Sequence, residues 1–405
     1  MTAFGLLLLM LGALFLLGRV RPGAPWRSAY LPTLDGWRAI ACALVVLDHT
    51  ARGIGVGEPS PFIHGQHGVN IFFGLSGLLI TTKIMEEREQ TGRISLVNFY
   101  RRRVFRLYPG ACLFLAVVAV LASLGCVRVK PVDFTACVLY FRNFCDPSSS
   151  LVTAHFWSLA IEEQFYLVVP VTFLLLGTRR FQSFAVMGIA ASAFSRWLFF
   201  CIHPQYSYLL AFRTDRRVDG LLAGCLMAIV LHDRRARGWL QRALNLPIWC
   251  VLAGGLIWWI HRHGEFTTLL ESLVVPLLLA GTVLRHGTWA GRILEWKLLR
   301  VMGRASYSLY LWQQLFAFHS AGHSTFSAVQ HFPLNVVAIF TCAAGSYYLV
   351  ECPLLKWASK APVGRVACPK PSGDVRIRLD LGVSVTHGQQ ASRGSSASRP
   401  SGCSR

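Results

Sequence analysis

Ten apolar segments, separated by polar connections, limit what this chain can fold into more than any other feature of its sequence. A membrane-spanning helix needs about 20 mainly apolar residues, and most of the segments approach this length. Hydrophobic residues make up 54% of the chain and charged residues only 15%, which is typical of membrane proteins. We therefore predict an all-α integral membrane protein, a bundle of about ten transmembrane helices. The segments are residues 34–50, 68–84, 106–125, 158–177, 182–201, 218–231, 246–261, 267–284, 304–320 and 334–351.

The two ends of the chain differ from this middle part. Residues 4–18 are apolar but short, and no basic stretch of the signal-peptide kind precedes them, so we predict one extra N-terminal membrane helix. Beyond about Lys360 the sequence is rich in Gly, Ser and Arg, which favours a disordered basic tail. The predicted organisation is an N-terminal helix and linker (1–30), a membrane domain (31–357) and a tail (358–405).

Basic residues are distributed unequally between the connections. A net charge of +21 would suggest a nucleic-acid partner in a soluble protein, but here the positive charges lie between apolar segments. If residues 19–33 are cytoplasmic and the chain alternates sides, the cytoplasmic connections carry 21 Lys and Arg residues and the opposite ones 8. The positive-inside rule favours this orientation. It places Arg38 and the C-terminus toward the cytoplasm and His49 toward the outside, and we expect a bacterial inner membrane, membrane lipid as a partner and no nucleic acid.

The segment 34–50 carries two ionisable side chains in line. Arg38 and His49 are eleven residues apart, almost a whole number of turns, so they lie on one helix face roughly 16 Å apart along the axis. Asp35 is one turn before Arg38 and can hold its guanidinium. Ionisable groups at membrane depth often mark a substrate or proton route. The alternative is that Arg38 reaches the headgroups and His49 lies at the opposite interface, and this helix alone does not separate the two.

Four arginines crowd the start of the third segment, namely Arg101, Arg102, Arg103 and Arg106. They fit plain positive-inside charge or anionic-lipid binding. They also fit a clamp for a phosphorylated cofactor, because arginine suits bidentate phosphate contacts. Taken alone, the cluster favours the first interpretation.

Two other segments carry polar side chains at membrane depth. In the second segment, Ser76 and Gly77 allow another backbone to approach closely, so packing is the favoured role of Ser76. The fourth segment has adjacent acids, Glu162 and Glu163, whose side chains point about 100° apart. At most one of them therefore faces the same cavity as His49. Such an acid needs a partner, and an arginine or a histidine is expected.

Cysteine and histidine spacing does not predict a metal site. The 12 cysteines include no Cys-x-x-Cys pair, which makes zinc unexpected. Three of them, Cys126, Cys137 and Cys145, fall in or beside one connection, where a disulfide can form. Two close pairs of histidines lack a third ligand in sequence and are not expected to bind metal, namely His64 with His67 and His261 with His263.

Seven blocks of sequence, taken together and in order, resemble the acyltransferase 3 family. They are the Arg–ten residues–His pattern of Arg38 and His49, FFGLSGLLIT, RRVFR, HFWSLAIEEQFYLVVP, RVDGLLAG, GRASYSLYLW and a Glu-Cys-Pro ending. The resemblance covers about residues 31–357, and no single block carries it. Members of this family are multipass membrane acyltransferases that O-acylate carbohydrates and related acceptors.

The resemblance implies a donor, an acceptor and roles for several residues. Acyl-CoA, acetyl-CoA by default, gives up its acyl group from the cytoplasmic side, and a carbohydrate or glycolipid is modified toward the outer face. His49 matches the family's essential histidine and Arg38 its partner in the same motif. Glu162 matches the family's helix-four acid, in the block that also contains Trp157 and Tyr166.

The same resemblance assigns Arg102, Arg103 and Arg106 to the basic motif that engages CoA. Two departures from the family pattern stand out. Many members have a histidine after the Tyr-Leu-Trp of helix nine, whereas this chain has Gln313, so helix nine is expected to supply no second base. The usual Glu-Arg-Pro near the end is Glu-Cys-Pro here. The hydrolase-like C-terminal domain that some members use is not expected to follow.

The chemistry of acyl transfer fits these roles. The reaction needs a base for the acceptor hydroxyl and stabilisation of the thioester oxyanion, and an imidazole titrates in the right range for the first task. We predict His49 as general base and Arg38 as the group that orients the donor or stabilises charge. A covalent acyl-histidine stays open as an alternative. Lipopolysaccharide sugar, exopolysaccharide, glycolipid and small glycoside all fit as acceptors.

Two other classes of protein compete with the acyltransferase interpretation. A transporter or flippase would use the same buried Arg, His and Glu side chains for solute or proton passage. The sequence shows neither internal repeats nor paired helices broken by Gly or Pro, which counts against a transporter. A structural membrane protein would leave the in-line Arg38 and His49 unexplained.

Overall fold

The computed structural model describes residues 31–53, 64–205, 212–263, 268–317 and 328–360. By its internal contacts the chain divides into residues 1–368 and 369–405, and the second unit lies wholly outside the described residues. The predicted N-terminal helix and the predicted disordered tail lie outside them as well. Within the described ranges the chain is helical and contains no strand, so the all-α prediction is confirmed.

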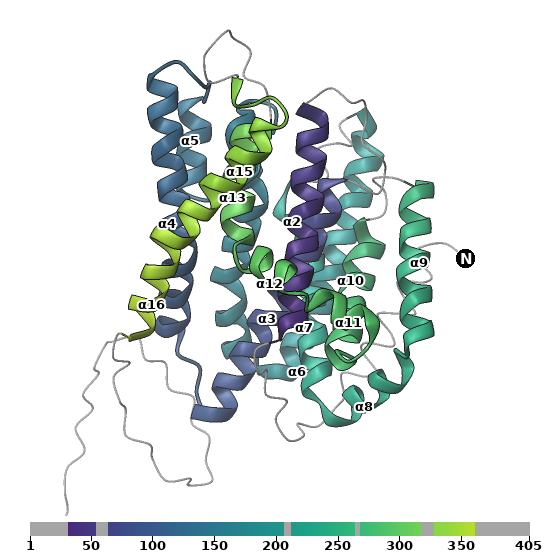
Figure 1. Cartoon of the computed structure of the whole chain (residues 1–405). Coiled ribbons are helices and arrows are strands. Elements are labelled where there is room, and N and C mark those ends of the chain that lie inside the picture. Colours follow the sequence, from purple (N-terminus) through teal and green to yellow (C-terminus); the bar gives the residue numbers. More distant parts are fainter. Residues whose placement is uncertain (1–30, 54–63, 206–211, 264–267, 318–327, 361–405) are drawn as a thin grey trace, which may run out of the picture. The chain divides into compact units, whose positions relative to one another are not determined.

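Every predicted apolar segment overlaps a helix of the described residues (Figure 1). The elements are α2 (Pro32–Gly53), α3 (Gly65–Thr91), α4 (Leu96–Ser123), α5 (Pro131–Val138), η1 (Arg142–Phe144), η2 (Leu151–Thr153), α6 (Phe156–Ile202), α7 (Thr214–His232), α8 (Arg234–Ala243), α9 (Leu246–His263), α10 (Thr268–Leu284), α11 (Trp289–Leu294), α12 (Lys297–Arg304), α13 (Ser306–Ala317), α15 (Leu334–Gly345), the π-helix Ser346–Glu351 and α16 (Cys352–Lys360).

Four described helical stretches are long and apolar enough to cross a membrane, and a pair of helices bent by 76° makes a fifth if the pair forms one span. The four are Gly65–Thr91, Leu96–Ser123, Leu151–Ile202 and Leu334–Ala358, and the pair joins Arg234–Ala243 to Leu246–Ile260. Thr268–Leu284 is apolar but shorter. The count of about ten spans therefore stays a prediction.

The fourth and fifth predicted segments form one helical run, α6, that turns back at Gly177. Gly177 has φ 67° and ψ 173°, a conformation that only glycine adopts readily. The ring centroids of Phe173 and Phe181 are 5.0 Å apart. Eight residues of straight helix would separate them by about 12 Å along the axis. The chain therefore folds back on itself at Gly177, as the prediction of two separate helices requires.

Close packing of α3 on α7 depends on glycines. A Cβ atom on Gly77 would lie 1.9 Å from the carbonyl oxygen of Leu221, and one on Gly224 would lie 2.4 Å from the carbonyl oxygen of Gly74. Only residues without a side chain fit these contacts. The predicted close backbone approach at Ser76-Gly77 is confirmed, with α7 as the partner helix.

The helix α2 runs parallel to α13. The Cys42 thiol donates to the carbonyl oxygen of Ser306, with 3.7 Å between sulfur and oxygen, and seven residues later His49 contacts Gln313. Both pairs have the same sequence separation, 264 residues, so the two helices advance together in the same direction. This packing places both ends of α2 against residues of other helices. Cys126, Cys137 and Cys145 are free thiols, so the disulfide that the sequence allows is not formed among them.

Candidate active site

A cavity opens between α2, α3, α4, α6 and α13, with an empty volume of about 690 Å³ that includes the space at its mouth. Three arginines and one carboxylate are the charged members of its lining, namely Arg38, Arg103, Arg106 and Glu162. We call it the arginine cavity. Its remaining lining is made of apolar and hydroxyl-bearing side chains. This combination of an apolar wall with a few converging polar groups is typical of small-molecule sites.

The three guanidiniums crowd one another. Arg103 and Arg106 are three residues apart on α4 and so share a helix face. The charges of Arg38 and Arg103 both act on Arg106. Two of the arginines also have local partners: Arg38 lies 4.0 Å from the Asp35 carboxylate, and Arg103 lies 4.5 Å over the centre of the Tyr166 ring. Three like charges facing one carboxylate leave the cavity electropositive, which favours an anionic ligand.

Arg102 points away from the arginine cavity. Its side chain is 58% exposed and donates to the Glu87 carboxylate over 2.9 Å. The reason is helical geometry, because neighbouring residues on a helix point about 100° apart. The structure thus brings Arg103 and Arg106 together in the cavity and leaves their predicted partner Arg102 outside its lining. Whether these arginines bind CoA stays a prediction.

Glu162 is held by two hydroxyl groups. Ser76 donates to Glu162 Oε1 over 2.7 Å, and Tyr166 donates to Glu162 Oε2 over 3.2 Å. The Tyr166 hydroxyl also lies 3.1 Å from Ser76 Oγ, which closes a three-membered cluster. Ser76 therefore positions an acid in addition to lying beside the α3–α7 contact. Glu163 does not line the cavity, because neighbouring residues on a helix point about 100° apart.

Trp157 packs against a residue of the cavity wall. It is buried and outside the lining, and its ring meets the Phe73 ring edge-on with 6.3 Å between the centroids. Phe73 itself forms part of the cavity wall. The structure therefore gives Trp157 a packing contact rather than a direct place in the cavity.

His49 lies outside the lining of the arginine cavity. Its Nδ1 is 2.7 Å from Oε1 of Gln313 on α13. The α2 face between Arg38 and His49 carries Cys42 and Val45, both only 1% exposed. Arg38 and His49 lie on the same continuous helix, as the in-line prediction requires. However, packed side chains rather than open space fill the helix face between Arg38 and His49.

Sequence reasoning missed His155 as a neighbour of the site. Its side chain is 2% exposed, and its backbone carbonyl accepts hydrogen bonds from Ser158 over 3.1 Å and Tyr310 over 3.4 Å. Both of these residues line the arginine cavity. His155 is also near enough to His49 for the charges of the two imidazoles to interact. The motif containing His155 was visible in the sequence, but no spacing rule links it to a histidine more than a hundred residues earlier.

The other histidines do not form a metal centre within the described residues. No described group of three His, Cys, Asp or Glu residues has the arrangement of a metal site. His67 instead pairs with the buried Glu271 over 3.0 Å. The side chains of His261 and His263 lie outside the described residues.

Most of the chain matches one family of known proteins. Residues 31–351 match the family described as "Acyltransferase domain" (Acyl_transf_3). The chain belongs to the acyltransferase 3 family. This confirms the resemblance seen in the sequence blocks and, together with the apolar helices, makes the chain a multipass membrane protein.

Two relatives from Staphylococcus aureus illustrate the similarity. A protein of strain COL named "Putative O-acetyltransferase" is 30% identical over 372 residues, which cover 83% of this chain and 59% of the relative. The O-acetyltransferase OatA of strain NCTC 8325 is 27% identical over 366 residues, which cover 82% of this chain and 58% of OatA. The chain therefore spans less than two thirds of the length of the curated relatives it matches. No solved structure matches the chain significantly.

Proposed function

We propose that this protein is a membrane O-acyltransferase that moves an acyl group, acetyl by default, from acyl-CoA to a hydroxyl of a carbohydrate or glycolipid. The observation that supports this most is the arginine cavity, because three guanidiniums face it from two helices and one of them, Arg38, shares its helix with His49. Family membership favours this activity over the transporter alternative.

The donor is proposed to bind through its phosphates. Arg103 and Arg106 lie at the cavity, and guanidiniums make charge-assisted, bidentate contacts with phosphate oxygens. Binding an anion would also relieve the repulsion among the three arginines. Arg38 would then contact the donor at the wall of the cavity that α2 forms. Glu162, fixed by Ser76 and Tyr166, would set the orientation of this charge cluster.

The chemical step is acyl transfer with His49 as general base, which requires the packed side chains between Arg38 and His49 to move aside so that the acyl end of the donor reaches the imidazole. The acceptor oxygen attacks the thioester carbonyl carbon, and His49 takes the hydroxyl proton as the new C–O bond forms. The C–S bond then breaks, and the proton passes from His49 to the departing sulfur, which leaves as the CoA thiol. His49 thus ends in its starting state. Positioned proton transfer of this kind contributes typically 10²- to 10⁴-fold to a rate.

The charge distribution supports the proposed orientation in the membrane. With the basic connections inside, the arginine cavity would receive acyl-CoA from the cytoplasm of a bacterial inner membrane, and the acceptor would be exported or cell-surface carbohydrate. His49, eleven residues further along α2, would act toward the outer side. The C-terminus would lie in the cytoplasm.

The test measures thioester turnover and binding separately. Wild-type protein in nanodiscs is mixed with radiolabelled acetyl-CoA, with and without a crude envelope-polysaccharide acceptor. His49→Ala is expected to bind acetyl-CoA normally and to lose turnover by about 100-fold or more. Arg103→Ala is expected to weaken binding by about 10-fold or more, because it removes a charge-assisted contact.

Arg102→Ala is the matched control, since it removes an arginine of the same motif that lies outside the cavity lining. It is expected to weaken binding less than Arg103→Ala. If His49→Ala turned over acetyl-CoA at the wild-type rate, the general-base role would be wrong. If wild-type protein neither bound nor consumed any acyl-CoA tested, the acyltransferase proposal would fall.

A further inference from the structure

The position of Gln313 opposite His49 is set by helix packing. The parallel helices α2 and α13 keep the same register at Cys42–Ser306 and at His49–Gln313. Gln313 is fully buried, so its amide has few orientations available. The contact with His49, at 2.7 Å, is therefore a fixed feature of the bundle and not a chance meeting of two flexible side chains.

A chain of hydrogen bonds decides which atom of Gln313 faces His49. Gln314 Nε2 donates to the carbonyl oxygen of Leu151 over 2.8 Å, which leaves its amide oxygen as an acceptor. Gln313 Nε2 donates to that oxygen over 3.2 Å. Gln313 Oε1 is left to face His49 Nδ1, and an amide oxygen can only accept. His49 must therefore carry a proton on Nδ1, and in the neutral imidazole the lone pair then lies on Nε2.

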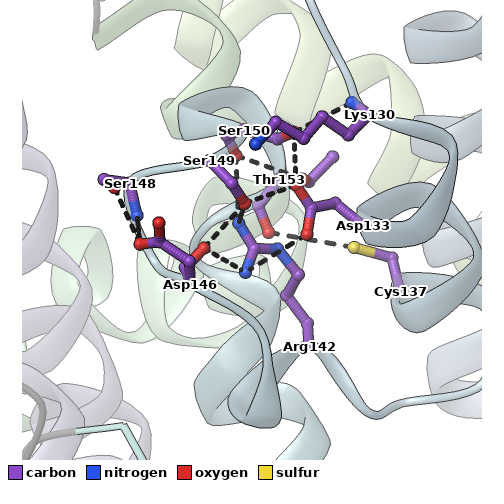
Figure 2. Close-up of polar contacts among 9 residues, drawn as sticks. All are labelled: Lys130, Asp133, Cys137, Arg142, Asp146, Ser148, Ser149, Ser150 and Thr153. Atoms are coloured by element: carbon purple, nitrogen blue, oxygen red, sulfur yellow. Dashed lines mark hydrogen bonds and ion pairs between the residues drawn. The ribbon is translucent and has the colours of Figure 1, made fainter.

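The far end of this chain is anchored in a buried polar cluster. Figure 2 shows the residues around the Asp133–Arg142 ion pair, in which the guanidinium and the carboxylate are 3.8 Å apart. Ser150, directly before η2 (Leu151–Thr153), donates to Asp133 over 2.6 Å. The carbonyl oxygen of Thr153, at the end of η2, accepts a hydrogen bond from the Cys137 thiol over 3.9 Å. Contacts before and after Leu151 thus fix the carbonyl that holds Gln314.

We propose that Gln313 and Gln314 are positioning residues that hold His49 in the tautomer with a proton on Nδ1 and the lone pair on Nε2. This inference rests on the proposed function, since it names the atom that removes the acceptor proton. It also explains the departure from the family pattern at Gln313: the residue does not act as a base but accepts a hydrogen bond from one. A neutral amide, unlike a carboxylate, does this without favouring the charged imidazolium.

The first test compares two variants of Gln313. Gln313→Leu removes the acceptor at similar volume, and kcat is expected to fall on the order of 10- to 100-fold with little change in KM for acetyl-CoA. Gln313→Glu keeps an acceptor but adds a charge that stabilises imidazolium. Its activity is expected to return at higher pH, so the acidic limb of the pH–rate profile moves to higher pH than in the wild type.

Gln330→Leu is the matched control. Gln330 is equally buried, and its amide donates to the carbonyl oxygen of Leu315 over 2.9 Å. Its kcat is expected to stay within about 3-fold of the wild type once the folded fraction is matched by size-exclusion chromatography. If it lost as much kcat as Gln313→Leu, the effect would be one of general packing and the positioning role would be wrong.

The second test does not depend on activity. Nitrogen-15 NMR of protein labelled at the histidine rings distinguishes the two neutral tautomers, and the His49 signals are assigned by their loss in His49→Ala. A protonated Nδ1 in the wild type and a mixture of tautomers in Gln313→Leu are expected. Wild-type protein that transfers acyl groups with the proton on Nε2 would overturn the inference. Wild-type protein with the expected tautomer but no acyl-CoA turnover would instead sink the proposed function and leave the inference standing.

Discussion

His155 is a buried imidazole, and neither of its ring nitrogens has a hydrogen-bond partner among the described residues. The rings of Phe114, Phe156 and Tyr310 surround it, with centroids 5.3, 5.0 and 5.7 Å away. A buried polar atom without a partner costs about 1–3 kcal/mol, so such a residue is usually retained for a reason other than stability. His155→Phe keeps the aromatic packing and removes both nitrogens. We expect it to raise the free energy of unfolding by about 1 kcal/mol and to lower acyl transfer, because His155 adjoins both His49 and the cavity.

Thermal unfolding in detergent and acetyl-CoA turnover measure these two effects. Phe156→Leu changes the same aromatic group without touching the imidazole and serves as the control for packing. It is expected to lower the unfolding temperature and to leave turnover per folded molecule near that of the wild type. A His155→Phe protein with undiminished turnover would show that His155 has no part in the reaction.

Single residues differ in how far the sequence alone identifies them. Arg38 and Glu162 could be predicted because ionisable side chains stand out in apolar helices, and both do line one cavity. The exposed position of Arg102 follows from the 100° between helical neighbours, but the sequence did not show which face of α4 would turn inward. The partnership of His49 with Gln313 joins residues 264 positions apart and depends on the register of two packed helices. No local pattern encodes such a register.

At the scale of elements, the short helix α5 and the turn η2 are joined by the Asp133–Arg142 cluster. Asp133 is buried, and burial alone would raise its pKa. Hydrogen bonds from Ser149 and Ser150 and the nearby Arg142 charge outweigh this effect and lower the pKa of Asp133 below its usual value. The ionised carboxylate therefore stabilises the fold. This contribution is complete above the ordinary aspartate pKa of about 3.9 and is lost as the pH falls through the lower, folded-state pKa.

Asp133→Asn tests this account. Removing one charge of a buried ion pair is expected to cost about 3 kcal/mol of stability at pH 7 and to make the unfolding temperature less dependent on pH below 4. Because η2 carries the Leu151 carbonyl, kcat is expected to fall as well. Asp146→Asn is the control, since Asp146 is exposed and its carboxylate accepts from Ser148. Equal unfolding temperatures for the two variants would show that the buried ion pair does not hold this turn.

The positions of the helices were easier to predict than which helices pack against each other. Each predicted apolar segment overlaps a helix, although the short helices α5, α8 and α11 lie between the predicted segments. The small residues at Ser76-Gly77 predicted a close contact. The sequence could not show that α7 makes that contact, because any helix with a complementary glycine would fit. Nor could it show that α6 turns back at Gly177, since the break needs a backbone conformation that composition does not reveal.

For the whole molecule, the proposed reaction requires that the two ends of α2 face different sides of the membrane. One end of α2 packs against α11 and α12 (Figure 1). Arg38 lies at that end, where Gly36 approaches Leu294 and Asp35 approaches Gly303, and His49 lies at the other end, beside Asp48, which approaches Gly65 at the start of α3. The excess of Lys and Arg in alternate connections predicts that the Arg38 end is cytoplasmic. With that orientation, the proposed reaction would bring a cytoplasmic donor and an external acceptor to one helix without moving either across the bilayer.

Reporter fusions in a bacterial host test this orientation. Alkaline phosphatase, which is active only outside the cytoplasm, is expected to be active when fused after Pro147 and inactive when fused after Arg93 or Lys360. Green fluorescent protein at the same positions is expected to show the reverse pattern, which controls for unequal expression. Phosphatase activity after Arg93 and Lys360 but not after Pro147 would place the arginine cavity on the outer side. Acyl-CoA, which is confined to the cytoplasm by its charge, could not then reach Arg103 and Arg106, and the donor assignment would be wrong.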